Sequence, residues 1–205
     1  MTSVIAALLV SLLLEDAHVI PNVEPMQGPD PTLSAIARSV RVAKDPSLTD
    51  AYLFGVSGAA FLATVCSNNC NCREWRELSL RIDPALKALG VEFEKLEGGS
   101  DDATWMRVKA SIDDGVPVQV WNLFGDWEDS LLTGYDLGKD LAYGWGALPA
   151  GKEYNTSKLS EWRKQGISGY IVKRGKPAEG ERKALELASL RGVLAFERRS
   201  PICGG

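Results

Sequence analysis

The chain has 205 residues, of which 45% are hydrophobic and 24% are charged, and its formal net charge is −4. These values are ordinary for a globular protein, and a chain of this length buries roughly 70% of its unfolded surface. The composition therefore excludes a disordered tail, a fibrous repeat and a strongly basic nucleic-acid binder. Because there is a single histidine, a His-rich metal site is excluded, and any catalytic imidazole must belong to His18.

The N-terminal segment begins with an apolar run at residues 4–14. The run is shorter than the ~20 residues that a membrane span needs. No Lys or Arg precedes it and two acidic residues, Glu15 and Asp16, follow it, which disfavours a secretory signal. Three prolines between residues 20 and 30 then disfavour a long helix. We expect residues 1–29 to be a segment packed on the domain.

Helix signals begin at residue 30. Asp30 and Pro31 are typical of a helix start, and apolar residues then recur at helical spacing as far as Lys44. Further on, two glycines flank Ser57 just before an apolar segment of small residues. This pattern predicts a tight turn at residues 55–58 that leads into a buried central helix.

The rest of the chain alternates between helix and strand patterns. Helices are predicted at residues 84–90, 101–115, 156–165 and 181–195. Strands are predicted at residues 91–96, 116–121, 130–135, 140–145 and 169–173, the third and fourth joined by a hairpin turn. The order predicts one α+β domain with N-terminal helices packed on a mostly antiparallel sheet. Its expected limits are residues 30–175, and residues 176–205 are expected to form a C-terminal helix and tail.

Three segments together resemble a known family. They are GVSGAAF at residues 55–61, W-x6-ID-x-GVPV at residues 105–118 and LLTGYD at residues 131–136. In order and spacing they resemble uncharacterised papain-like proteins that group with the C39-like peptidase domain and the N-terminal domain of the butirosin-biosynthesis H protein. The resemblance covers about residues 30–175. It implies a papain-like fold, in which a nucleophile at the N-terminus of a central helix faces strands that carry the base and its orienting partner. Family activities are thiol-dependent peptide cleavage or acyl transfer.

The positions that carry thiol chemistry in the family are all changed in this chain. The family's cysteine, histidine, oxyanion glutamine and orienting aspartate fall, in that order, on Ser57, near Glu128 or Asp129, near Asp50 or Ala51, and near Gly144. We therefore expect a pseudoenzyme that binds a peptide or acyl substrate without Cys-His catalysis. The resemblance makes an acyl-carrier protein the candidate protein partner. No cofactor, nucleic acid or membrane is expected.

Two other functions remain open. Ser57 would be the nucleophile of an active hydrolase or acyltransferase if Glu128 or Asp129 acted as its base. A hydroxyl with a pKa near ~15 is a poor partner for an ordinary carboxylate, so the simpler role for Ser57 is that of a helix N-cap. In the other alternative, the chain is an oligomerising partner in a larger assembly, and its apolar N-terminal run packs against a neighbour.

The remaining candidate residues favour structural roles. Cys66, Cys70 and Cys72 are crowded together and Cys203 is distant, a poor spacing for zinc. We expect free thiols in a cytoplasmic protein, with a local disulfide or a metal site as alternatives and no metal in the preferred interpretation. His18 is expected to be a surface or structural residue.

Acidic and aromatic residues surround the predicted strands. The acidic loop formed by Asp126, Glu128 and Asp129 is expected to be solvated, the alternative being a site for a hard cation or a cationic substrate. Several aromatic residues lie on or beside the strands, and we expect at least half of them to belong to the core. They are Trp121, Trp127, Tyr135, Tyr143 and Trp145.

Overall fold

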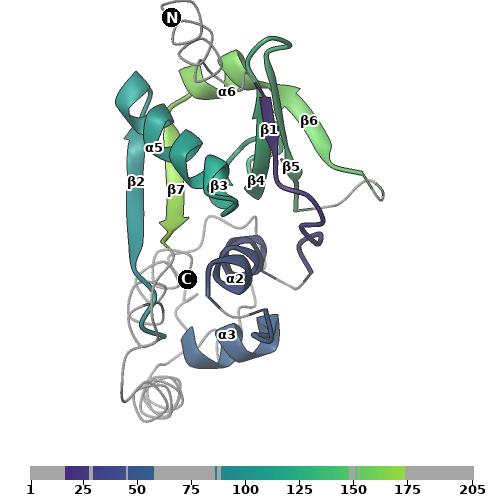
Figure 1. The fold of residues 1–205 in the computed structure, drawn as a ribbon, viewed down its shortest axis with the longest axis vertical. Coiled ribbons are helices and arrows are strands. Elements are labelled where there is room, and N and C mark those ends of the chain that lie inside the picture. The colour runs from purple at the N-terminus through teal and green to yellow at the C-terminus, as the bar shows by residue number, and fades with distance from the viewer. Residues whose placement is uncertain are drawn as a thin grey trace, which may run out of the picture.

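The computed structural model describes residues 17–27, 30–44, 46–57, 86, 89–147, 151 and 153–173. It is an α+β structure built on a mostly antiparallel sheet (Figure 1), which confirms the predicted class. The strands are β1 (Ala17–Val19), β2 (Phe93–Gly99), β3 (Val118–Trp121), β4 (Asp129–Asp136), β5 (Leu141–Trp145), β6 (Asn155–Lys158) and β7 (Ile167–Val172). The helices are α2 (Pro31–Ala43), α3 (Asp50–Ser57), α5 (Asp102–Asp113) and α6 (Leu159–Lys164).

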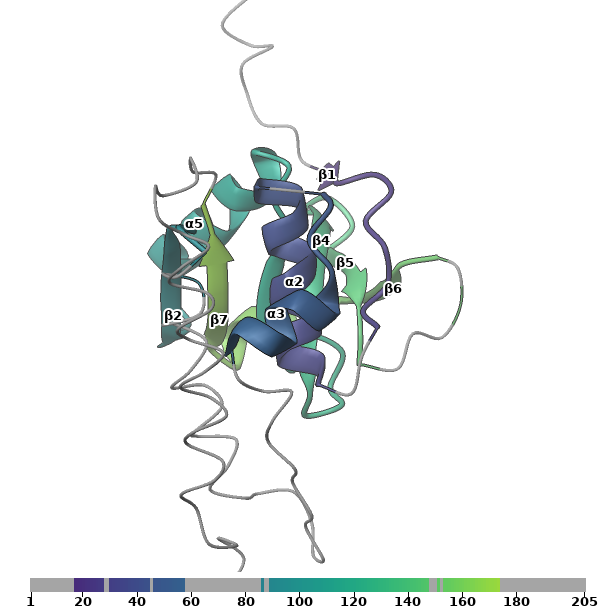
Figure 2. The ribbon, with the colours of Figure 1, turned by 90° about the horizontal axis from the view of Figure 1, so that it is seen from below.

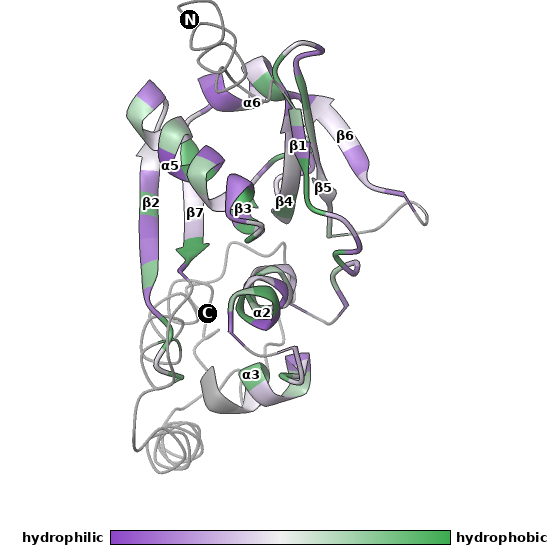
Figure 3. Ribbon diagram, in the orientation of Figure 1, coloured by the Kyte–Doolittle hydropathy of each residue, from purple (hydrophilic) through white to green (hydrophobic). Residues whose placement is uncertain are grey.

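The sheet is arranged around β4. Its strand order is β2-β7-β3-β4-β5-β6, and β1 also pairs with β4. One edge of β4 pairs with β5, and the other edge is shared, because β3 pairs with the start of β4 and β1 with its end. Trp121 of β3 lies opposite Asp129, and His18 of β1 lies opposite Tyr135. On the outer strand β2, hydrophilic residues predominate (Figure 3), as is usual for an edge that must not pair with another chain.

A β-bulge divides β4 into two halves. The pairing of β4 with β5 shifts between Leu132 and Gly134, so the alternation of faces changes at Thr133. Tyr135 therefore points to the face that α5 covers. Its ring contacts Trp105 edge to face at 5.6 Å, and its hydroxyl donates to Asp113 Oδ1 at 2.6 Å. In the first half of β4, Asp129 points to the other face of the sheet, where it contacts α2.

Helix α2 is the central helix of the described structure. It begins as predicted, because the side chain of Asp30 accepts a hydrogen bond from the Leu33 amide at 2.9 Å and Pro31 opens the first turn. Leu33, Ile36 and Val40 are fully buried in a cluster with residues of β7. The helix packs on β3, β4 and β7, and α3 packs on α2 in turn (Figure 2).

The turn predicted at residues 55–58 is wrong in its described part. Residues 50–57 form α3 instead. The Thr49 hydroxyl accepts a hydrogen bond from the Tyr52 amide at 3.1 Å, so the helix is capped and begins well before Gly55. A Cβ atom at Gly55 would meet nothing within 4 Å, and a single glycine inside a helix costs only about 1 kcal/mol.

A second correction concerns residues 156–158, which are predicted as the start of a helix. They belong to β6 instead, because Ser157 pairs with Ala142 of β5 and continues the sheet. Helix α6 begins only at Leu159, where Asp140 caps it: Asp140 Oδ1 accepts from the Ser160 amide at 2.8 Å. Strand β1 was not predicted, because residues 1–29 were expected only as a segment packed on the domain. The remaining described elements agree with prediction to within a few residues.

Parts of several predictions fall outside the described residues. These are the apolar run at 4–14, most of the helix at 84–90, the helix at 181–195 and all four cysteines. Within the ranges that the structure describes, no helix has the length and apolar character needed to cross a membrane.

The N-terminal residues 20–26 form a loop that other elements hold in place. Trp145 Nε1 donates to the Val23 carbonyl at 2.8 Å. The Tyr154 hydroxyl donates to the Ile20 carbonyl at 2.7 Å and accepts from the Val23 amide at 3.0 Å. This loop leads directly into the start of α2, so these bonds help to position that helix end.

Replacing Arg38 with methionine is expected to lower the free energy of unfolding by about 2 to 3 kcal/mol. The Arg38 side chain is 5% exposed and its Nη1 donates to Asp50 Oδ1 at 2.5 Å, linking α2 to α3. Methionine keeps most of the packing but leaves the Asp50 carboxylate without this partner. Urea unfolding measures the loss. The control is Arg41→Met, which removes a more exposed pair with Glu24 and is expected to cost less than about 1 kcal/mol. Equal losses in both variants would contradict the prediction.

Candidate functional site

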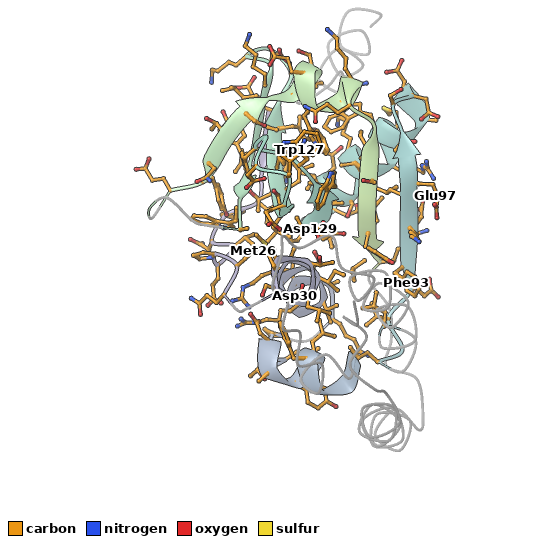
Figure 4. The ribbon with its side chains drawn as sticks, turned by 180° about the vertical axis from the view of Figure 1, so that it is seen from behind. Met26, Asp30, Phe93, Glu97, Trp127 and Asp129 are labelled. Atoms are coloured by element: carbon orange, nitrogen blue, oxygen red, sulfur yellow. The ribbon has the colours of Figure 1, made fainter. Side chains whose placement is uncertain are left out.

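Three side chains from three elements meet where α2 begins and β4 starts. The Thr32 hydroxyl, in the first turn of α2, donates to Asp129 Oδ2. Gln119 Nε2, on β3, donates to Asp129 Oδ1 at 2.5 Å. Figure 4 shows Asp129 above Asp30, with Trp127 on the far side of Asp129. We call Asp30, Thr32, Gln119, Glu128 and Asp129 together the α2–β4 junction.

The three carboxyl groups of the junction all have a raised pKa. Burial raises the pKa of Asp129 to about 6, and the negative charges of Asp30 and Glu128 add to the effect, against the hydrogen bonds from Thr32 and Gln119. Burial also raises the pKa of Asp30, in spite of its backbone hydrogen bonds. The pKa of Glu128 is raised by burial and by the charges of Asp126 and Asp30. Asp129 is therefore the group at this site that changes protonation near neutral pH.

The amides at the start of α2 are already used. Asp30 Oδ1 accepts from the Leu33 amide, and the Asp30 carboxylate also accepts from the Thr32 amide. The Ser34 amide donates to the Asp30 carbonyl at 3.0 Å, and Pro31 has no N–H to offer. The helix start therefore leaves no first-turn amide free to stabilise an oxyanion.

The loop before β4 is held in one shape by Asn122. The Asn122 amide donates to the Glu128 carbonyl at 2.9 Å, and its side-chain Oδ1 accepts from the Trp127 amide at 2.9 Å. Trp127 has a φ of 59° and is 73% exposed. A bulky residue in the left-handed region costs about 1 to 3 kcal/mol, so the Asn122 bonds are needed to keep this loop, and Glu128 with it, in place beside Asp129.

No family model matches the chain, and neither a curated protein nor a solved structure matches it. The chemistry of the site therefore has to be inferred from the contacts of its own residues.

The structure brings together only part of the predicted site. Glu128 and Asp129 lie at the junction with α2. Most of the segment after Phe54, which was predicted to face them, lies outside the described residues. Ser57 is the last described residue of α3 and lies about two turns from the start of that helix, not at its N-terminus as expected. The Ser57 side chain lies outside the described part of the structure, so its role as a nucleophile stays a prediction.

The residues missed by the sequence analysis are Thr32 and Gln119. Both left a signal. Thr32 follows the Asp-Pro helix start, which places a hydroxyl in the first turn of an amphipathic helix. Gln119 interrupts the apolar strand Val-Pro-Val-Gln-Val, and an amide in the middle of a buried strand needs a polar partner.

His18 is remote from the junction. It pairs with Tyr135 in the second half of β4, six positions from Asp129, or about 20 Å along the strand. Because the chain has only this histidine, no imidazole can serve as a base for Thr32 in the arrangement that the structure describes.

Some of the acidic and aromatic residues near the strands are exposed, and others are buried. Asp126 and Glu128 are exposed as expected, whereas Asp129 is turned toward α2 and hydrogen bonded. Trp145 and Tyr135 are buried in the core, and Trp121 and Trp127 are exposed. Among the described residues, no group of three His, Cys, Asp or Glu side chains is arranged to hold a metal ion.

Proposed function

We propose that the chain is a papain-like domain, similar to the C39-like peptidase and acyltransferase group, that binds a peptide or acyl ligand at the α2–β4 junction without covalent turnover. The observation that carries the proposal is the contact of the Thr32 hydroxyl with the Asp129 carboxyl, itself held by Gln119. In the papain-like arrangement, the start of the central helix holds the nucleophile, and the strands hold the base and its orienting partner. In this proposal Thr32, Asp129 and Gln119 take those three places.

The chemistry of these side chains favours binding over turnover. A carboxylate whose pKa is about 6 is too weak a base to deprotonate much of a threonine hydroxyl, whose pKa is near ~15. An alkoxide or oxyanion at this point would also face the negative charges of Asp30 and Glu128. The amides that would stabilise such a charge are occupied by Asp30.

One observation favours a second candidate, an active hydrolase or acyltransferase. Asp129 is in direct contact with the Thr32 hydroxyl, and its raised pKa brings it nearer to that of a working general base. Thr32 would then be the nucleophile and Asp129 the base. The equivalent proposal for Ser57 is kept as a separate arm of the test.

Covalent labelling separates the two candidates. The protein is incubated at pH 7.5 with p-nitrophenyl acetate or a fluorophosphonate, and its intact mass is measured. We expect no stable adduct and no release of nitrophenolate above the rate in buffer, and the same result for Thr32→Val and Ser57→Ala. An adduct that is lost in Thr32→Val would establish the hydrolase with Thr32, and one lost in Ser57→Ala would establish the hydrolase with Ser57.

Binding is tested by thermal unfolding in the presence of ligand pools. A pool of short peptides and an acylated carrier protein are added separately, and a ligand that binds the folded state raises the Tm. We expect at least one of them to raise the Tm of the wild type and to have less effect on Asp129→Asn. The absence of any shift with either pool would contradict the proposed function.

A further inference from the structure

The α2–β4 junction has an excess of negative charge. Asp30 and Asp126 lie close enough to Glu128 for their charges to raise its pKa, and Asp30 and Glu128 do the same to the pKa of Asp129. In the described parts of the chain, no Lys or Arg forms an ion pair with any of the four. Acidic groups on other faces do have such partners: Arg107 lies 2.5 Å from Glu94, and Arg163 lies 2.6 Å from Asp102.

The side-chain carbonyl oxygen of Gln119, a buried residue beside these carboxylates, accepts no hydrogen bond. Gln119 is 2% exposed, and its Nε2 is used by Asp129 Oδ1. Its Oε1 has no hydrogen-bond partner. Because both atoms belong to one amide group, Oε1 lies next to the Asp129 carboxyl. A buried oxygen without a donor is costly, so a ligand that brings N–H groups to Asp129 would also relieve this cost.

An exposed indole borders the same carboxyl. Trp121 lies directly opposite Asp129 in the pairing of β3 with β4, which places their Cβ atoms about 5 Å apart on one face of the sheet. Trp121 is 40% exposed, so part of its surface is accessible to a partner. Trp127, more exposed still, stands on the loop that carries Glu128.

We propose that the α2–β4 junction binds the guanidinium group of an arginine in a peptide ligand. A guanidinium is planar and always charged, offers five N–H donors in a fixed fork and stacks on aromatic rings. It matches a set of acceptors at Asp129, Glu128 and Gln119 beside the indole of Trp121. The ammonium group of a lysine has the same charge, but it is not planar and does not offer N–H donors in a fixed fork. This inference rests on the proposed function, because it names the part of the peptide that the same site would hold.

The test compares three peptides that differ at one side chain. Acetyl-Ala-Arg-Ala-amide, its citrulline analogue and its lysine analogue are titrated at pH 7.5 into protein with ¹⁵N-labelled tryptophan, and the indole N–H signals are followed by NMR. Citrulline keeps the shape of arginine without its charge. We expect the arginine peptide to bind at least tenfold more tightly than the citrulline peptide, and several-fold more tightly than the lysine peptide.

Variants locate the binding. Asp129→Asn is expected to weaken the arginine peptide at least tenfold and Glu128→Gln about threefold. Glu97→Gln is the charge-matched control, since Glu97 lies on the outer strand β2, away from the junction (Figure 4), and it is expected to have no effect. Glu128 is exposed, so Glu128→Gln reports on binding even if Asp129→Asn changes the fold.

Equal affinity for arginine and citrulline peptides would overturn the inference, as would equal affinity for arginine and lysine peptides or equal effects of Glu128→Gln and Glu97→Gln. If the mixed peptide pool raises the Tm but the arginine peptide does not bind, the inference fails and the proposed function stands. If neither binds and the carrier protein also has no effect, both fail.

Discussion

Alanine in place of Gly169 is expected to lower the free energy of unfolding by about 3 to 5 kcal/mol. Gly169 lies in β7 where that strand pairs with β3, and its φ is 151°. An added Cβ atom would overlap the backbone carbonyl oxygen of Gln119 and reach 3.0 Å from the Val120 Cα. Backbone of a neighbouring strand cannot move aside as a side chain can, so the pairing itself must open. Urea unfolding followed by circular dichroism measures the loss.

Gly55→Ala is the matched control for that substitution. Gly55 lies in α3, where an added Cβ atom would meet nothing within 4 Å. Alanine is the better helix former, so the control is expected to be neutral or to stabilise the protein by up to about 1 kcal/mol. Similar small effects at both positions would show that β7 does not approach β3 as closely as described.

Asp129→Asn is expected to change the pH dependence of stability by about 3 kcal/mol. A carboxyl whose pKa is raised from 3.8 to about 6 keeps its proton longer in the folded state than in the unfolded chain. Its contribution to stability is therefore largest below pH 4 and is lost as the pH rises through about 6. Asparagine does not titrate. The stability of the variant relative to wild type should thus rise by about 3 kcal/mol between pH 3.5 and pH 7.

Denaturant unfolding at a series of pH values checks this difference. Subtracting the wild-type curve from the curve of Asp129→Asn removes the contributions of the other carboxyl groups, apart from the coupling of Asp30 and Glu128 to Asp129. Glu97→Gln on the exposed edge strand is expected to give a nearly flat difference. A flat difference for Asp129→Asn as well would mean that Asp129 is not buried among other acidic groups.

The fold was predictable where local signals agree with tertiary packing. The Asp-Pro start and the apolar spacing of α2 point to the same helix, and Leu33 and Ile36 are buried as that spacing requires. The prediction failed where two local signals compete. The glycines at 55 and 58 suggested a turn, but the Thr49 hydroxyl caps a helix that begins before them. At residues 156–158 pairing with β5 overrides the polar sequence that suggested a helix start.

The candidate site was only half predictable for a different reason. Glu128 and Asp129 stand out in the sequence as acidic residues just before an apolar strand. Their partner Thr32 is 97 residues away, and the contact depends on how α2 is placed across the sheet. No spacing rule connects a first-turn hydroxyl to a strand that far along the chain. The resemblance assigns the central helix to the residues after Ser57, which lie outside the described part of the structure, so that assignment stays a prediction.

Because of the bulge at Thr133, the two halves of β4 direct their functional side chains to opposite faces of the sheet. Before the bulge, the strand supplies a carboxyl to the side of the sheet where a ligand would enter, and after it the strand supplies a phenol that anchors α5 through Asp113. One extra residue thus puts Asp129 and Tyr135 on opposite faces of the sheet within a single strand. If the proposed function holds, the residues that set ligand preference are separate from those that hold α5, so the first can change without loss of the second.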